Sequence, residues 1–183
     1  MIKPRKDKRG FTNVSKHHAF KDSKNKNFQS RLEKEALSFI NQEKFIEAEN
    51  LYRELIANGS NNHIVFGNLA ALYGIRGKKD EMVKLLKRAL TIQPKYADAH
   101  NNLGVVLQEQ GDLKNAIISF TKAIEIKPGY SDAQLNLANA FKQKGDIDNA
   151  ILYYTEVVET CPEYVEVYNT LASCLREKGD INS

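Results

Sequence analysis

The chain has 183 residues, of which 42% are hydrophobic and 27% charged, and its formal net charge at pH 7 is +4. These proportions are ordinary for a soluble protein, and the two cysteines, Cys161 and Cys174, are too few for a disulfide framework. No apolar run approaches the length of a membrane span, so we expect a cytoplasmic protein.

The first 28 residues carry most of the positive charge. Residues 1–28 contain nine Lys or Arg and two acidic residues, whereas residues 29–183 contain 18 basic and 21 acidic residues. The segment lacks a helical hydrophobic period, so we predict a basic disordered tail. Its charge could contact nucleic acid or an anionic membrane. A solvated leader explains the same charge without a partner, and this is the interpretation we favour.

From residue 29 onward the chain repeats with a period of 34 residues. Four types of residue keep this step, namely Pro94, Pro128 and Pro162; Gly77, Gly111, Gly145 and Gly179; Leu69, Leu103, Leu137 and Leu171; and Tyr96, Tyr130 and Tyr164. The period predicts units at residues 29–62, 63–96, 97–130 and 131–164, followed by a partial unit at residues 165–183.

Each unit is predicted to form two helices. In the third unit, hydrophobic residues recur at helical spacing on both sides of Gly111, which tolerates the left-handed turn that ends a helix. Asp112 is a candidate N-cap for the second helix, and Pro128 ends that helix because proline lacks an amide hydrogen. The same turn is expected in three other units, at Gly77-Lys78 with a weaker cap, at Gly145-Asp146 and at Gly179-Asp180.

Small residues at the eighth position of each unit let its two helices approach closely. The eighth positions are Ala36, Ala70, Gly104, Ala138 and Ala172. Bulky residues at the twenty-fourth position are expected to fill the space between successive units, and these are Tyr52, Leu86, Phe120 and Tyr154. One helix pair cannot bury its apolar stripe alone, so the units must stack.

The spacing Leu103-Gly104-x-x-Leu107, Ala116-x-x-x-Phe120, Ala123 and Pro128 resembles the tetratricopeptide-repeat consensus. The resemblance covers roughly residues 29–183. It implies an all-α solenoid of antiparallel helix pairs that winds into a right-handed superhelix. It also implies that the first helix of each unit lines a concave groove.

The sixth position of the units is the most informative groove position, because it holds Asn68, Asn102 and Asn136. An amide side chain offers donors and an acceptor, so a row of them could bind the main chain of an extended peptide. Such a row is similar to the one in the repeat region of O-linked N-acetylglucosamine transferases. The alternative is that these asparagines bond between neighbouring helices and fix the stacking register.

The remaining groove candidates are polar residues of mixed charge on the first helices. They are Asp98, Asn101, Gln108, Asp132, Asn139, Lys142, Gln143, Glu166, Asn169, Ser173 and Arg176. A solvated helix face is the alternative explanation for any one of them.

The sequence contains no pattern typical of an enzyme. There is no glycine-rich phosphate loop, and the acidic residues are dispersed rather than gathered. We therefore expect no catalytic residues, no metal site and no cofactor in these residues.

The fifth unit stops after its predicted first helix. The apolar stripe of that helix, Tyr168, Leu171, Ala172 and Leu175, would normally be covered by a second helix. We interpret this as the front part of a longer protein, or as an end that packs on another chain, including by self-association.

Two functions therefore remain open. The first is a protein-interaction scaffold that binds an extended polypeptide in its groove. The second is the substrate-recruiting repeat region of a larger transferase, such as a protein glycosyltransferase or, less favoured, a sulfotransferase or methyltransferase.

Overall fold

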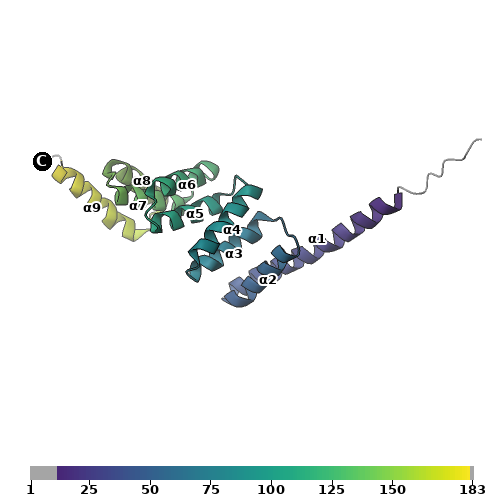
Figure 1. Cartoon of the computed structure of the whole chain (residues 1–183). Coiled ribbons are helices and arrows are strands. Elements are labelled where there is room, and N and C mark those ends of the chain that lie inside the picture. Colours follow the sequence, from purple (N-terminus) through teal and green to yellow (C-terminus); the bar gives the residue numbers. More distant parts are fainter. Residues whose placement is uncertain (1–11, 182–183) are drawn as a thin grey trace, which may run out of the picture. The chain divides into compact units, whose positions relative to one another are not determined.

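A computed structural model describes the backbone of residues 12–181 and the side chains of residues 25–179 (Figure 1). Within these residues every regular element is an α-helix, which confirms the predicted all-α class. The helices are α1 (Thr12–Asn41), α2 (Phe45–Ala57), α3 (His63–Ile75), α4 (Lys79–Ile92), α5 (Ala97–Glu109), α6 (Leu113–Ile126), α7 (Ser131–Lys144), α8 (Ile147–Thr160) and α9 (Val165–Ile181).

The chain divides into two compact units, one containing α1 and α2 and the other containing α3 to α9. In the larger unit, α3 packs on α4, α5 on α6 and α7 on α8, and each pair also contacts the next helix in the chain. The smaller unit is the single pair of α1 and α2. The 34-residue period of the sequence therefore corresponds to a succession of helix pairs.

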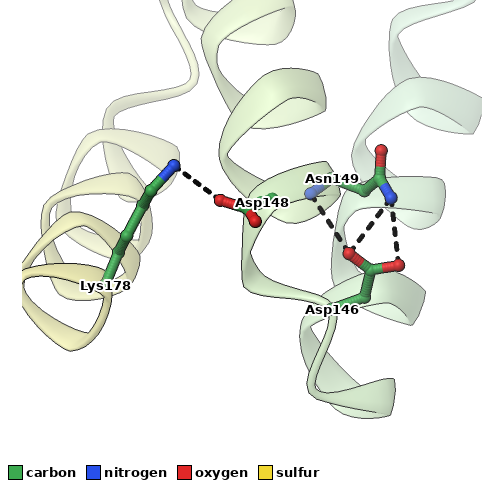
Figure 2. Close-up of polar contacts among 4 residues, drawn as sticks. All are labelled: Asp146, Asp148, Asn149 and Lys178. Carbon is green, nitrogen blue, oxygen red and sulfur yellow. Dashed lines mark hydrogen bonds and ion pairs between the residues drawn. The ribbon is translucent and has the colours of Figure 1, made fainter. Parts of the chain in front are cut away.

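Glycines and aspartates shape the turns inside the pairs. Gly111 and Gly145 have φ angles of +80° and +83°, the left-handed conformation that glycine adopts without steric cost. Asp112 then accepts a hydrogen bond from the backbone amide of Asn115 at 3.3 Å, and Asp146 caps α8 in the same way (Figure 2). Lys78 makes no side-chain cap for α4, as the sequence predicts.

The positions that repeat in the sequence form the core of the larger unit. Leu86, Phe120 and Tyr154 are almost completely buried, and so are the alanines that face them, such as Ala138. At Gly104 the ring of Phe120 occupies the space that a Cβ atom would take, only 2.5 Å away. Phe120 thus packs on the small eighth residue of its own unit, and it also clusters with Leu137 and Ala140 of the next unit, as expected of a residue between successive units.

The start of α1 differs from the prediction. A disordered tail was expected up to residue 28, but α1 already begins at Thr12, so residues 12–28 are helical. No proline or glycine interrupts residues 12–41, and extending an existing helix is far easier than nucleating one. The remaining part of the predicted tail, residues 1–11, lies outside the described residues.

The end of the chain also differs from the prediction. Gly179 was expected in a turn, but α9 continues through it to Ile181. Glycine permits a left-handed turn without requiring one, and within the described residues no helix after α9 packs back to enforce it. Val165, Tyr168 and Leu175 of α9 are 44–69% exposed. Self-association through this face stays a prediction.

Candidate functional site

The first helices of successive pairs converge on one side of the larger unit. Helix α3 contacts α5, and α5 contacts α7, whereas no comparable contact joins α4 to α6 or α6 to α8 among the described residues. Elements on the inner side of a curved stack lie closer together than those on the outer side. The first helices therefore line the inner face, where the groove candidates were sought.

Two amide pairs join α5 to α7 on this face. The side-chain amide of Asn136 donates to the amide oxygen of Asn101 at 3.0 Å. That of Gln108 donates to the amide oxygen of Gln143 at 3.2 Å. Each pair links residues 35 positions apart, so the polar side chains of one pair of helices hold the next in register. For Asn136 this contact corresponds to the alternative interpretation, a bond between neighbouring helices.

The preceding junction, between α3 and α5, lacks these pairs. The positions that correspond to Asn101 and Gln108 are occupied there by Gly67 and Gly74, which have no side chain. Asn102, the counterpart of Asn136, therefore has nothing to bond. Among the described residues its half-buried side-chain amide makes no hydrogen bond.

A recess of about 290 Å³ lies beside this amide. Helices α3 and α5 form its walls with the start of α4, and its lining consists of Ala71, Gly74, Ile75, Lys79, Met82, Asn102, Val105, Val106 and Glu109. The lining is thus mainly apolar. Its charged members, Lys79 and Glu109, form an ion pair with a separation of 3.0 Å.

Neighbouring side chains leave little room for any residue larger than glycine at Gly67 and Gly74 in this junction. A Cβ atom at Gly67 would lie 2.7 Å from the ring of Tyr96, and one at Gly74 would lie 2.9 Å from the sulfur of Met82. The space next to Gly67 is therefore filled by an aromatic ring, whereas that next to Gly74 borders the recess.

The two aspartate candidates at the starts of α5 and α7 bind tyrosines. The hydroxyl of Tyr164 donates to Asp132 at 2.9 Å, and this hydrogen bond raises the pKa of Tyr164. Burial raises the pKa of Tyr130, and a hydrogen bond to Asp98 adds to the effect. Both aspartates are exposed, but each has a partner within the protein.

The other candidates occupy different environments. Asn139 accepts a hydrogen bond of 2.6 Å from the buried hydroxyl of Tyr154, so it serves the core between α7 and α8. Asn68 on α3 and Lys142 on α7 are half-buried, and two candidates on α9 are exposed, Asn169 and Arg176. Asn102 is the candidate that the structure brings to a recess.

Sequence reasoning missed the apolar wall of the recess. Ile75, Met82 and Val105 were not candidates, because a search for polar groove residues passes over them. The available signal was the absence of side chains, since Gly67 and Gly74 are one heptad apart on the same helix. Within the described range, no group of three His, Cys, Asp or Glu could hold a metal ion, and no helix is suited to crossing a membrane.

The fold is shared with several solved proteins. MamA from Desulfovibrio magneticus RS-1 superposes with a TM-score of 0.74 and 16% identity, over 83% of this chain and 86% of that one. YrrB, described as a TPR protein with an unusual peptide-binding site, has a TM-score of 0.65 and 19% identity, over 74% and 70% of the two chains. PilF from Pseudomonas aeruginosa has a TM-score of 0.75 and 16% identity, over 85% and 71%.

None of the curated proteins matches the chain by sequence. The family models do match: Tetratricopeptide repeat at residues 97–130 and again at residues 131–164, and TPR repeat at residues 72–111. Together the three matches cover just over half of the chain. The helix pairs, the repeated core positions and these matches agree, and the chain belongs to the tetratricopeptide-repeat proteins.

Proposed function

We propose that this chain is a protein-interaction scaffold, and that the inner face of α3, α5 and α7 binds an extended segment of another polypeptide. The proposal assigns no catalytic role and no cofactor to the described residues. Its general support is the fold, together with the similarity to YrrB, a TPR protein that has a peptide-binding site of its own.

The observation that carries the proposal is the side-chain amide of Asn102. It has no hydrogen-bond partner within the described residues, and it borders the recess. A half-buried polar group without a partner costs free energy unless water or a ligand satisfies it. Asparagine offers an acceptor and two donor hydrogens, which match the N–H and C=O groups of one residue of an extended peptide.

The amide pairs at the next junction explain why Asn102, and not one of the other amides, is the proposed anchor. Asn101 bonds to Asn136 and Gln108 bonds to Gln143, so these four amides are engaged in holding helices together. A ligand would have to break those hydrogen bonds to use them. It would break none at Asn102, which is therefore our proposed main-chain anchor.

The alternative function, a substrate-recruiting region of a larger transferase, remains a prediction from sequence resemblance. No feature of the described residues favours it over the scaffold. The likeness to the repeats of O-linked N-acetylglucosamine transferases is likewise a prediction.

The proposal is tested by selecting peptides from a random 12-residue library on the immobilised full chain. The dissociation constant of a selected peptide is then measured by fluorescence anisotropy. We expect Asn102→Ala to weaken binding about tenfold, because one or two hydrogen bonds worth about 0.5–1.5 kcal/mol each are lost.

Asn50→Ala is the matched control, since Asn50 is an exposed asparagine of α2. Its affinity for the peptide should equal that of the unmodified chain. Equal affinities of the chain and its Asn102→Ala variant, or a library that yields no binder, would overturn the proposal.

A further inference from the structure

We infer that the recess beside Asn102 takes one bulky aliphatic side chain of the bound polypeptide, with leucine as the best match. This inference rests on the proposed function and adds a specificity to it. The ligand would then be an extended segment whose main chain pairs with Asn102 and whose neighbouring apolar side chain enters the recess.

The size of the recess fits such a side chain. Its volume of about 290 Å³ exceeds the roughly 150 Å³ that suffices for a benzene molecule in an engineered protein cavity. A leucine side chain is smaller than benzene, and it enters with part of the main chain that carries it. The recess also opens to solvent along α3, where Ile75 is 67% exposed, so an extended chain can pass over it.

The surface of the recess is complementary to an aliphatic group. Val106 and Met82 are 2% and 7% exposed and form its inner part, with Val105 beside them. Burying apolar surface here removes water from both partners, and complete burial of a leucine side chain strengthens binding by about tenfold to a hundredfold.

The charges at the rim disfavour a charged side chain. Lys79 and Glu109 neutralise each other at a separation of 3.0 Å, so the rim offers no net charge to a carboxylate or an ammonium group. A charged ligand group would have to compete for a partner that is already engaged, and it would lose hydration at the apolar wall.

Gly74 limits the recess, and with it the preference for an aliphatic side chain, to one junction. At the following junction the position of Gly74 is held by Gln108, whose amide bridges to Gln143. A ligand is therefore anchored at the junction of α3 and α5, and this fixes which residue of the segment must be aliphatic.

The test uses capped amino acids as minimal probes on the full, uniformly ¹⁵N-labelled chain. N-acetyl-leucine methylamide carries both the main-chain groups and the side chain, and the glycine and aspartate analogues serve as comparisons. We expect the leucine probe to bind at least tenfold more tightly than either. The changes in amide chemical shift that the leucine probe causes should be largest at Ala71, Gly74, Ile75, Asn102 and Val105.

Two variants fill the recess. The first filling variant is Gly74→Gln, which introduces the residue that the chain itself has at the next junction. Its control is Gly179→Gln, which makes the same change at a helical glycine with open space around it. Ala71→Leu is the second filling variant, because Ala71 is exposed and its replacement leaves the core intact. Both filling variants should lose the preference for leucine, and Gly179→Gln should keep it.

The two proposals fail in distinguishable ways. If a selected peptide binds and depends on Asn102, but the leucine probe shows no preference over glycine or shifts amides elsewhere, the aliphatic specificity is wrong and the scaffold stands. If no selected peptide depends on Asn102, the proposed function itself fails. Retained leucine preference in a folded Ala71→Leu variant would also overturn the inference.

Discussion

Gly104 sets how closely α5 and α6 approach each other. A Cβ atom at this position would lie only 2.5 Å from the ring of Phe120, and this ring is completely buried. The other described units that have both helices use alanine at this position. The third unit therefore exchanges the methyl group of alanine for closer contact with a large ring.

Gly104→Ala should destabilise the chain by about 1–2 kcal/mol. Overpacking a core costs about 1–3 kcal/mol, and the better helix propensity of alanine offsets up to about 1 kcal/mol of it. Urea denaturation followed by circular dichroism measures the change. Gly179→Ala is the control, because nothing lies within 4 Å of its added Cβ atom, and its stability should be unchanged or slightly higher. A Gly104→Ala variant as stable as this control would contradict the packing.

Tyr154 should make the stability fall at alkaline pH. Burial, with a smaller effect of Cys174, raises the pKa of Tyr154 to about 12. The tyrosine of the unfolded chain ionises near pH 10, so between about pH 10 and 12 the unfolded state holds fewer protons and the free energy of unfolding decreases.

Tyr154→Phe removes this titration. At pH 8 the variant should be less stable than the unmodified chain, because Asn139 loses its donor, and the difference should shrink towards pH 11.5. Urea denaturation at both pH values measures it. Parallel losses of stability in the two proteins would show that Tyr154 does not titrate as described.

At the scale of the helix, two neighbouring aspartates at the start of α8 have different roles. Asp146 accepts from the backbone amide of Asn149 at 3.4 Å and from its side chain at 3.0 Å. Asp148 forms an ion pair with Lys178 of α9, and the side chains of this pair are 77% and 49% exposed (Figure 2). A helix cap and a surface ion pair thus lie two residues apart.

Asp146→Ala should cost about 1 kcal/mol, because the first turn of α8 loses its cap. Asp148→Ala should cost less than half of that, since exposed ion pairs contribute little and are screened by salt. Thermal and urea unfolding of both variants at low and high salt would test this. The assignment fails if Asp148→Ala is the more destabilising change.

Helix ends were predictable where a side chain or a glycine determines them. Gly111 and Asp112 predict a turn between α5 and α6 from the sequence, and the structure contains this turn. The predicted start of α1 and the predicted end of α9 were wrong because no local residue determines either of them. Residues 12–28 contain nothing that stops a helix, and Gly179 permits a turn that only a second helix packed against α9 would enforce.

At the scale of the whole molecule, the 34-residue period predicted the succession of helix pairs but not the pairing of polar side chains. Asn68, Asn102 and Asn136 recur at a step of 34, whereas the observed hydrogen bonds join residues 35 apart, such as Asn101 and Asn136. The offset arises from how one helix pair stacks on the next, which a comparison of equivalent positions cannot reveal.

The recess was beyond sequence reasoning for a related physical reason. It borders Gly74, which contributes no side chain where the next junction has the amide of Gln108, while the missing side chain of Gly67 leaves Asn102 without the partner that Asn136 has. A pattern of polar residues marks groups that are present, and a binding site can depend equally on groups that are missing.

The most direct test of peptide binding on the inner face is where a selected peptide lies on the chain. The methyl groups of Ile, Leu, Val and Met are ¹³C-labelled, and nuclear Overhauser effects from an unlabelled peptide are recorded. We predict contacts from an aliphatic side chain of the peptide to Ile75, Met82 and Val105. Contacts confined to Ile118 and Leu152, the exposed apolar residues of α6 and α8, would contradict binding on the inner face.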